Sequence, residues 1–241
     1  MPAPRPKSRL VSFLLIGTIG LLLSGCVYLR LLELKKQLNH FDENFTLSTS
    51  EDLLLHCLHP VLQPDDLRWL GASPKTRTPR DNGEEWLVRW IKETTPDAKE
   101  ELVYDMTFYA YFVDNRMVDI RIPKRYLAYV SKDLVLNILR ATGSARVDKE
   151  EHKADAQTEA TAATPMPNLA AIKTMLGEPT SRQVSSNQIT QLYRYRLDSA
   201  TVAKPIEASF SFDSVTGELR RFTVHLPRGT LNYEFKPVPP R

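Results

Sequence analysis

The feature that most constrains the fold of this 241-residue chain is a set of sequence matches between its two halves. VDIRIPKRYL at 118–127 resembles FTVHLPRGTL at 222–231, and LVRWIK at 87–92 resembles LYRYRL at 192–197. These segments alternate apolar with polar residues and are rich in aromatic and branched side chains, as β-strands are. Because the matches occur in the same order in both halves, we interpret them as an internal duplication.

Two further pairs of segments predict helices. TSEDLLLHCL at 49–58 resembles VSKDLVLNIL at 130–139, and in both a Ser stands before Leu-rich turns, which is typical of a capped helix start. LRWLGASPKTR at 67–77 resembles IKTMLGEPTSR at 172–182, each a short helix that Leu-Gly ends. The predicted fold class is therefore α+β, with two tandem α-α-β-β-β units whose helices pack on one face of an antiparallel sheet.

Each predicted unit closes with a two-stranded hairpin. YAYFVDNRMVDIRIP at 109–123 turns at Asp-Asn, and FSFDSVTGELRRFTVHLP at 210–227 turns at Thr-Gly. Pro123 and Pro227 mark where each last strand leaves the sheet, because proline cannot donate to a strand ladder. The predicted boundaries are 49–129 for the first unit, 130–235 for the second and 236–241 for a tail.

The second unit contains an apparent insertion. The segment GSARVDKEEHKADAQTEATAATPMP at 143–167 has no Phe, Tyr or Trp and almost no large aliphatic residue. Such a composition buries too little apolar surface to offset the entropy lost on ordering. We therefore expect 143–167 to be a disordered surface loop.

The N-terminal segment predicts export. Residues 1–9 are basic, residues 10–23 are uncharged and largely apolar, and Ser-Gly-Cys follows at 24–26. A basic head, a short apolar run and small residues before a cleavage point form an export signal. The apolar run is short for the ~20 residues that span a bilayer. We expect a signal peptide at 1–25, and an uncleaved signal anchor is the alternative.

LSGC at 23–26 resembles the lipobox of bacterial lipoproteins. The resemblance implies that Cys26 receives a diacylglycerol, carries acyl chains such as palmitate and becomes the new N-terminus, so the membrane is one expected partner. Residues 26–48 would then form a lipid-anchored helical spacer, which we expect to pack on its own domain or on the bilayer surface. Its apolar residues follow the spacing of one helix face: Val27, Leu31, Leu34, Leu38 and Phe41.

Charge and cysteine content narrow the possible partners. Without residues 1–25 the formal net charge falls from +3 to zero, because Arg5, Lys7 and Arg9 are lost with no acidic residue. Nucleic-acid binding rests on clustered Lys and Arg, so we expect no nucleic-acid partner. Cys57 is then a single thiol, which we interpret as a small buried hydrophobe.

No set of residues predicts an enzyme. HCLH at 56–59 offers His56, Cys57 and His59, but closed zinc sites need four converging ligands. The chain has no Gly-rich phosphate loop, Gly-x-Ser-x-Gly elbow or Cys-x-x-Cys motif. We therefore expect no catalytic residues, no metal and no cofactor. The acidic pairs are interpreted as helix-capping or solvated carboxylates: Asp65–Asp66, Glu84–Glu85 and Glu100–Glu101.

The two units differ on the sheet face that points away from their helices. In the first unit, strand alternation gives this face an apolar and aromatic set: Leu87, Ile91, Tyr109, Tyr111 and Met117. The matching residues of the second unit are mostly polar: Leu192, Arg196, Ser209, Ser211 and the pair Arg220–Arg221. Exposed apolar patches mark interfaces, and Tyr and Met are enriched there. We predict that the first set binds a protein; the alternative is that the helix at 27–41 covers it.

These motifs together resemble a known family. A short helix ending in Leu-Gly-x-Pro (MLGEPTSRQ at 175–183), then an aromatic strand (YRYRL) and a hairpin, behind a lipobox, is similar to the SmpA/OmlA (BamE) outer-membrane lipoproteins. Two tandem copies resemble the β-lactamase inhibitory protein, whereas the lipoproteins usually have one. The resemblance implies a non-catalytic adaptor or scaffold, anchored at the outer membrane and facing the periplasm, that binds another envelope protein in outer-membrane assembly or maintenance. The alternative is an inhibitor or small-ligand binder that uses the open sheet face.

Replacement of Cys26 by Ser should abolish lipid attachment, because only a thiol can form the thioether. Metabolic labelling with an alkyne fatty acid should then give no signal, and the protein should leave the membrane fraction. Cys57→Ser is the matched control and should keep both. Full membrane retention of unlabelled wild-type protein would instead favour the signal anchor.

Overall fold

The computed structural model of the protein describes residues 27–94, 104–159, 166–199 and 204–236. The first half of the chain contains six strands: β1 (Phe45–Thr49), β2 (Leu53–Cys57), β3 (Thr76–Arg80), β4 (Gly83–Lys92), β5 (Met106–Val113) and β6 (Arg116–Ile122). The second half contains seven: β7 (Arg146–Asp148), β8 (Lys153–Glu159), β9 (Ser181–Val184), β10 (Gln188–Leu197), β11 (Ile206–Asp213), β12 (Leu219–Leu226) and β13 (Gly229–Lys236).

The helices are short. Residues 27–39 are helical, and the other helical elements are α2 (Phe41–Asn44), α3 (Pro64–Trp69), the 3-10 helix η2 (Lys124–Ala128), α4 (Lys132–Ser144) and α5 (Leu169–Leu176).

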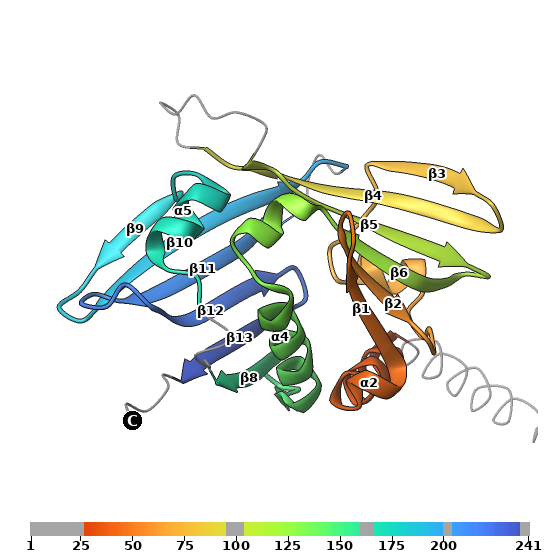
Figure 1. Cartoon of the computed structure of the whole chain (residues 1–241), viewed down its shortest axis with the longest axis horizontal. Helices are drawn as coiled ribbons and strands as arrows, with labels where there is room; N and C mark the ends of the chain where they lie inside the picture. Colours follow the sequence, from red (N-terminus) through yellow and green to blue (C-terminus); the bar gives the residue numbers. More distant parts are fainter. Residues whose placement is uncertain (1–26, 95–103, 160–165, 200–203, 237–241) are drawn as a thin grey trace, which may run out of the picture.

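All described strands join one 13-stranded sheet, ordered β1-β2-β6-β5-β4-β10-β11-β12-β13-β8-β7, with β3 paired to β4 and β9 to β10. The sheet is mixed, because β8 runs parallel to β13, whereas the other pairings of the sheet are antiparallel. Figure 1 shows the two halves side by side, with α4 between β8 and β1. The predicted fold class of two tandem α-α-β-β-β units is therefore wrong.

The first predicted helix, at 49–58, is instead the end of β1, a turn and β2. Leu53, Leu55 and Cys57 are buried in alternation along β2, which is the two-residue period of a strand. β2 pairs with β1 on one side and β6 on the other. The matching segment at 130–139 does form a helix, α4. The same Leu-rich pattern thus takes two conformations, because only in the first half do neighbouring strands pair with its backbone.

The predicted disordered loop at 143–167 contains β7 and β8, although residues 160–165 lie outside the described residues. β8 pairs in parallel with β13, a strand that the sequence did not predict, from Lys153 opposite Thr230 to Glu159 opposite Lys236. Ala156 is buried in the core cluster of the second half, and α4 packs on β8. The small side chains that resembled a disordered composition are the ones that let α4 lie close to the sheet.

Other local predictions are confirmed. Gly71 and Gly177 follow α3 and α5 with φ of 90° and 73°, so both helices end at a glycine with positive φ, which glycine adopts readily. The ψ of Gly177 is −158°, so its backbone lies outside the left-handed helical conformation predicted there. Asp114 and Asn115 turn the β5–β6 hairpin with φ of 47° and 59°. The two halves also share an order of elements. In the first half α3 is followed by the antiparallel strands β3, β4, β5 and β6, and in the second half α5 is followed by the antiparallel strands β9, β10, β11 and β12.

The helices cover one side of the sheet, which we call the inner face; the opposite side is the outer face. In the first half, Leu67 of α3 packs on Trp86 and Val88 of β4, together with Leu31 and Leu34 of the helix at 27–39. In the second half, α4 and α5 cover a cluster of aromatic residues: Tyr193, Tyr195, Phe210, Phe212, Tyr233 and Phe235. The helix at 27–39 therefore packs on the inner face of its own domain and does not cover the outer face.

A buried ion pair fixes the helix at 27–39 to α3. Arg30 donates two hydrogen bonds to Asp66, from Nε at 2.6 Å and from Nη2 at 2.7 Å, and Asp66 is fully buried. Asp66 also accepts a hydrogen bond from the backbone N–H of Gln63 at 2.8 Å, which confirms its predicted helix-capping role. One carboxylate thus caps α3 and holds the first helix in place.

Replacement of Arg30 by Gln should lower the free energy of unfolding by about 3 kcal/mol, because the charge of Asp66 would stay buried without its partner. The matched control is Arg221→Gln, which removes an exposed pair with Glu234 and should cost at most about 1 kcal/mol. Urea unfolding followed by circular dichroism measures both values. Equal losses would show that the Arg30 pair does not hold the helix.

Candidate binding surface

The outer face of β4, β5 and β6 brings together most of the residues that the sequence assigned to protein binding. Leu87 lies opposite Tyr109, and Tyr109 lies opposite Arg121. Tyr111 is two residues from Tyr109 on β5, and Ile91 lies further along β4. These side chains are half-buried and belong to none of the core clusters. We call Leu87, Ile91, Tyr109, Tyr111 and Arg121 the tyrosine face.

Met117, the fifth predicted member, lies on the inner face instead. A β-bulge in the β5–β6 pairing shifts the register between Tyr111 and Phe112, so Phe112 lies opposite Met117. Met117 is 3 % exposed and packs in the core cluster of the first half. Simple alternation from Val118 failed here because a bulge adds one residue and reverses which side chains face inward.

Arg121 was not predicted as a site residue, yet it organises the tyrosine face. Its guanidinium carbon lies 3.9 Å from the ring centroid of Tyr109, in a cation–π contact. Nη1 donates to Asp52 at 3.1 Å, and Nη2 donates to Glu85 at 3.0 Å. Partial burial opposes the charge of Arg121, but the hydrogen bonds to Glu85 and Asp52 outweigh it and raise its pKa. The carboxylates of Asp52 and Glu85 therefore hold a charged guanidinium over the tyrosine ring.

Tyr111 is also held in place. Its hydroxyl donates to Oδ1 of Asn82 at 2.9 Å, in the turn between β3 and β4. Arg80 of β3 pairs with Glu85 at 2.7 Å, which links that turn to the Arg121 network. A side chain that is already fixed loses little rotamer entropy on binding, so both tyrosines present preorganised contact area.

The outer face of the second half is polar, as the sequence predicted, and its polar groups pair with one another. Cross-strand pairs run over its strands: Thr190–Ser211 at 3.2 Å, Arg194–Glu207 at 2.7 Å, Arg221–Glu234 at 2.8 Å and Asp155–Asn232 at 2.8 Å. The hydrogen bond from Asn232 lowers the pKa of Asp155. Such a face is satisfied by its own partners and by water.

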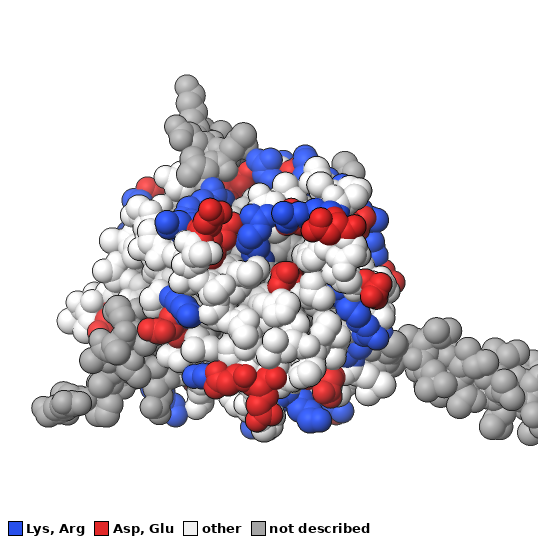
Figure 2. Space-filling model, turned by 45° about the vertical axis from the view of Figure 1, so that its right-hand side comes forward, with Lys and Arg blue, Asp and Glu red and all other residues white. Residues whose placement is uncertain are grey.

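The charged side chains do not form a patch of one sign on the face in Figure 2. Lys and Arg lie beside Asp and Glu along its upper and lower margins, and the area between is mostly uncharged. A nucleic-acid surface needs clustered positive charge, so this face does not have that character.

The residues of HCLH do not converge. His56 lies on the outer face, where its Nδ1 is 2.6 Å from Oδ1 of Asp119, whereas Cys57 is buried on the inner face and His59 is exposed. Within the described ranges, no group of three His, Cys, Asp or Glu side chains is placed to hold a metal ion. Glu84 accepts a hydrogen bond from Trp86 Nε1, and the pair Glu100–Glu101 lies outside the described residues.

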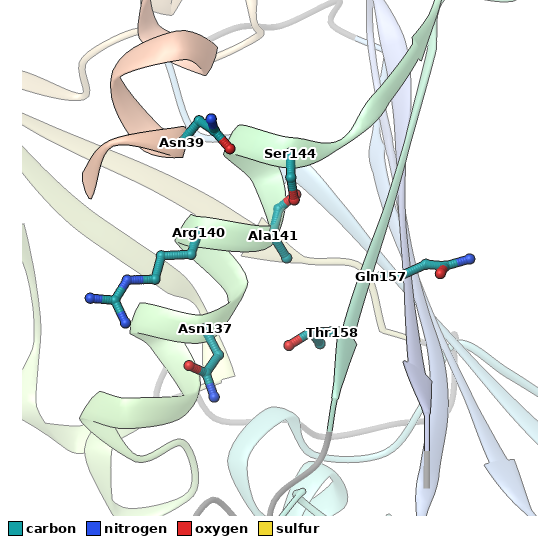
Figure 3. A pocket seen from close by; sticks show the side chains of 7 residues that line it. All are labelled: Asn39, Asn137, Arg140, Ala141, Ser144, Gln157 and Thr158. Atoms are coloured by element: carbon teal, nitrogen blue, oxygen red, sulfur yellow. The ribbon is translucent and has the colours of Figure 1, made fainter. Parts of the chain in front are cut away.

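A polar groove of about 460 Å³ lies between α4 and β8 (Figure 3). Its lining comes from the helix at 27–39, α4 and β8: Asn39, Asn137, Arg140, Ala141, Ser144, Gln157 and Thr158. In Figure 3 Arg140 points away from β8, and its guanidinium binds Asp42 at 2.8 Å. Gln157 points away from α4. Among the described residues that line the groove, Arg140 is the one with a charged side chain, and it points away from β8.

Comparison with known proteins adds no relative. No protein-family model matches the chain, and no curated protein or solved structure is significantly similar to it. Across the part of the chain that the structure describes, no helix is both long and apolar enough to cross a membrane.

Cys57 should resist alkylation in the folded protein. Burial, with a smaller contribution from Asp119, raises the pKa of its thiol to about 12. At about pH 8, only roughly one molecule in ten thousand then carries the reactive thiolate. In the Cys26→Ser chain, where Cys57 is the single thiol, mass spectrometry should detect iodoacetamide addition only in concentrated urea. Rapid modification in buffer alone would mean that β2 opens readily.

Proposed function

We propose that this protein is a non-catalytic, lipid-anchored adaptor of the bacterial cell envelope that binds another envelope protein through the tyrosine face. The observation that carries the proposal is the contrast between the two outer faces. In the second half, polar groups pair across the strands; at the corresponding place in the first half, two fixed tyrosines, Leu87 and Ile91 remain half-buried. Fixed Tyr and Arg side chains are the types that most often anchor a protein interface.

The proposed anchor fits the position of the first helix. The helix at 27–39 follows Cys26 directly, and its Arg30 is locked to Asp66 of the domain. A lipid on Cys26 would therefore be joined to the folded domain by a packed helix, and the domain would be held close to the membrane. This supports a domain held close to a membrane, and the Leu-Gly-x-Pro resemblance to the SmpA/OmlA lipoproteins supports a periplasm-facing position at the outer membrane.

The double variant Tyr109→Ser and Tyr111→Ser tests the proposed surface, because it gives the first half the serines of the second. Each tyrosine acting as an interface anchor contributes about 1–2 kcal/mol, so crosslinked partner recovered from membranes should fall at least about tenfold. The matched control is Ser209→Ala with Thr223→Ala, a directly paired set on the outer face of the second half. The control should keep full recovery.

Two further measurements distinguish a loss of binding from a loss of folding. Circular dichroism must show that the double variant is folded, since the loss of the Arg121 contact costs only about 1 kcal/mol. Leu87→Lys changes the same surface but keeps both tyrosines, and it should also reduce the recovery of the partner. Full recovery with both folded variants would exclude the tyrosine face, and recovery of a soluble enzyme in place of a membrane-associated protein would favour an inhibitor.

A further inference from the structure

The inner side of the molecule contains an apolar cavity of about 360 Å³. It lies where the helix at 27–39 and α3 of the first half meet the β12–β13 hairpin and the start of β8 in the second half. The apolar wall comes from both halves: Leu31, Leu34, Trp69, Ala154, Leu226 and Leu231. A cavity of this size and lining has the character of a small-ligand site.

The walls of the cavity meet through close backbone contacts. A Cβ atom placed on Gly143 of α4 would lie 2.2 Å from the backbone nitrogen of Asn39, so α4 touches the end of the first helix there. A Cβ on Gly71 would lie 2.8 Å from the ring of Pro227, which brings the end of α3 against the β12–β13 hairpin. At Gly143 backbone meets backbone, and at Gly71 the chain meets the ring of Pro227, so the elements around the cavity are already in contact without a ligand.

The lining also includes more cationic than anionic side chains. Lys35, Lys149 and Arg228 are half-buried or exposed around it, as is Lys153, whose ammonium pairs with Asp155 at 3.4 Å; Asp148 is the one carboxylate among the lining residues in the described chain. Asp148 already accepts hydrogen bonds from the backbone N–H groups of Glu150 and Glu151, at 3.0 Å and 3.1 Å. The net charge around the apolar space is therefore positive.

One polar atom of the lining lacks a partner. The hydroxyl of Tyr28 is buried and makes no hydrogen bond within the described residues. The ammonium group of Lys149 lies 5.6 Å from the centroid of the same ring. Buried hydroxyl groups are normally hydrogen-bonded, so this donor is available to an acceptor atom of a ligand beside a positive charge.

We propose that this cavity binds one fatty acid of about twelve carbons, with its alkyl chain between Leu34, Trp69 and Leu231 and its carboxylate among the lysines. A methylene group takes roughly the volume of a water molecule, about 30 Å³, so the cavity holds on the order of twelve methylenes. A diacylglycerol on Cys26 has two chains and no charge, and it fits neither the volume nor the cations. The inference uses different residues from the tyrosine face and does not depend on the adaptor function.

Photolabelling tests the inference on the full lipidated chain in neutral phosphatidylcholine vesicles. The probe is dodecanoic acid with a terminal diazirine, and mass spectrometry locates the adducts. Adducts should concentrate on the peptides that contain Leu34, Trp69 or Leu231, and excess unlabelled dodecanoate should displace the probe. Diazirine dodecanol, which lacks the charge, should label these peptides about tenfold less.

Substitutions inside and outside the cavity distinguish specific binding in the cavity from a general affinity of the protein surface for lipid. Lys35→Glu with Arg228→Glu should reduce labelling about tenfold, whereas Lys36→Glu, on the next residue of the same helix and outside the cavity, should leave it unchanged. Ala154→Phe should block the cavity. Adducts scattered over the surface, or equal labelling of the charge-reversed variant, would overturn the proposal. So would labelling of the Cys26→Ser chain but not of the lipidated chain, because the protein's own lipid would then occupy the cavity.

Discussion

The arrangement of this molecule depends on one short pairing, in which Trp90, Ile91 and Lys92 of β4 meet Leu197, Arg196 and Tyr195 of β10. Opposite residues of an antiparallel pair share a face, so this seam gives both halves a common inner face. Contacts across the seam fix its register: Lys92, which is 6 % exposed, donates from Nζ to the backbone carbonyl of Glu178, and Arg89 lies 3.6 Å from Asp198. A shifted pairing would leave the buried ammonium of Lys92 without this partner, at a cost of several kcal/mol.

Because the inner face is shared, both sets of helices lie on the same side of the sheet and the outer face is left for strands alone. The side chains on that exposed face differ between the two halves. The second half pairs Arg194 with Glu207 and Arg221 with Glu234, which suits contact with water. The first half places one guanidinium, that of Arg121, against Tyr109 and leaves aromatic area beside it. This difference in chemistry on a similar backbone is what separates a solvated surface from a candidate interface.

Sequence patterns predicted the parts of the fold that local chemistry decides and missed those that depend on distant partners. Gly71 and Gly177 end helices, and Asp114–Asn115 turn a hairpin, within a few residues, and the positions of these helix ends and of this turn were predicted correctly. The segments at 53–57 and 153–159 are strands because β6 and β13 pair with them, and no local pattern shows which distant strand will pair with a segment. Four of the five proposed surface residues lie on the outer face. Met117 does not, because the alternation of apolar and polar residues does not show where a β-bulge occurs. Arg121 could be identified as a member of this surface only from the strand register, which places it opposite Tyr109.

The helix at 27–39 belongs to the core of the first half and to the wall of the cavity, and it does not contact the tyrosine face. Leu34 packs into two core clusters of the first half and also lines the cavity, so the helix builds the core and the ligand wall at once. The tyrosine face lies on the opposite side of the same sheet. Substitutions there that keep the strands paired share no contact with the cavity, and the energetic effects of distant, unconnected sites are additive. A single sheet can therefore hold a lipid on its inner face and a protein on its outer face, with each function open to separate disruption.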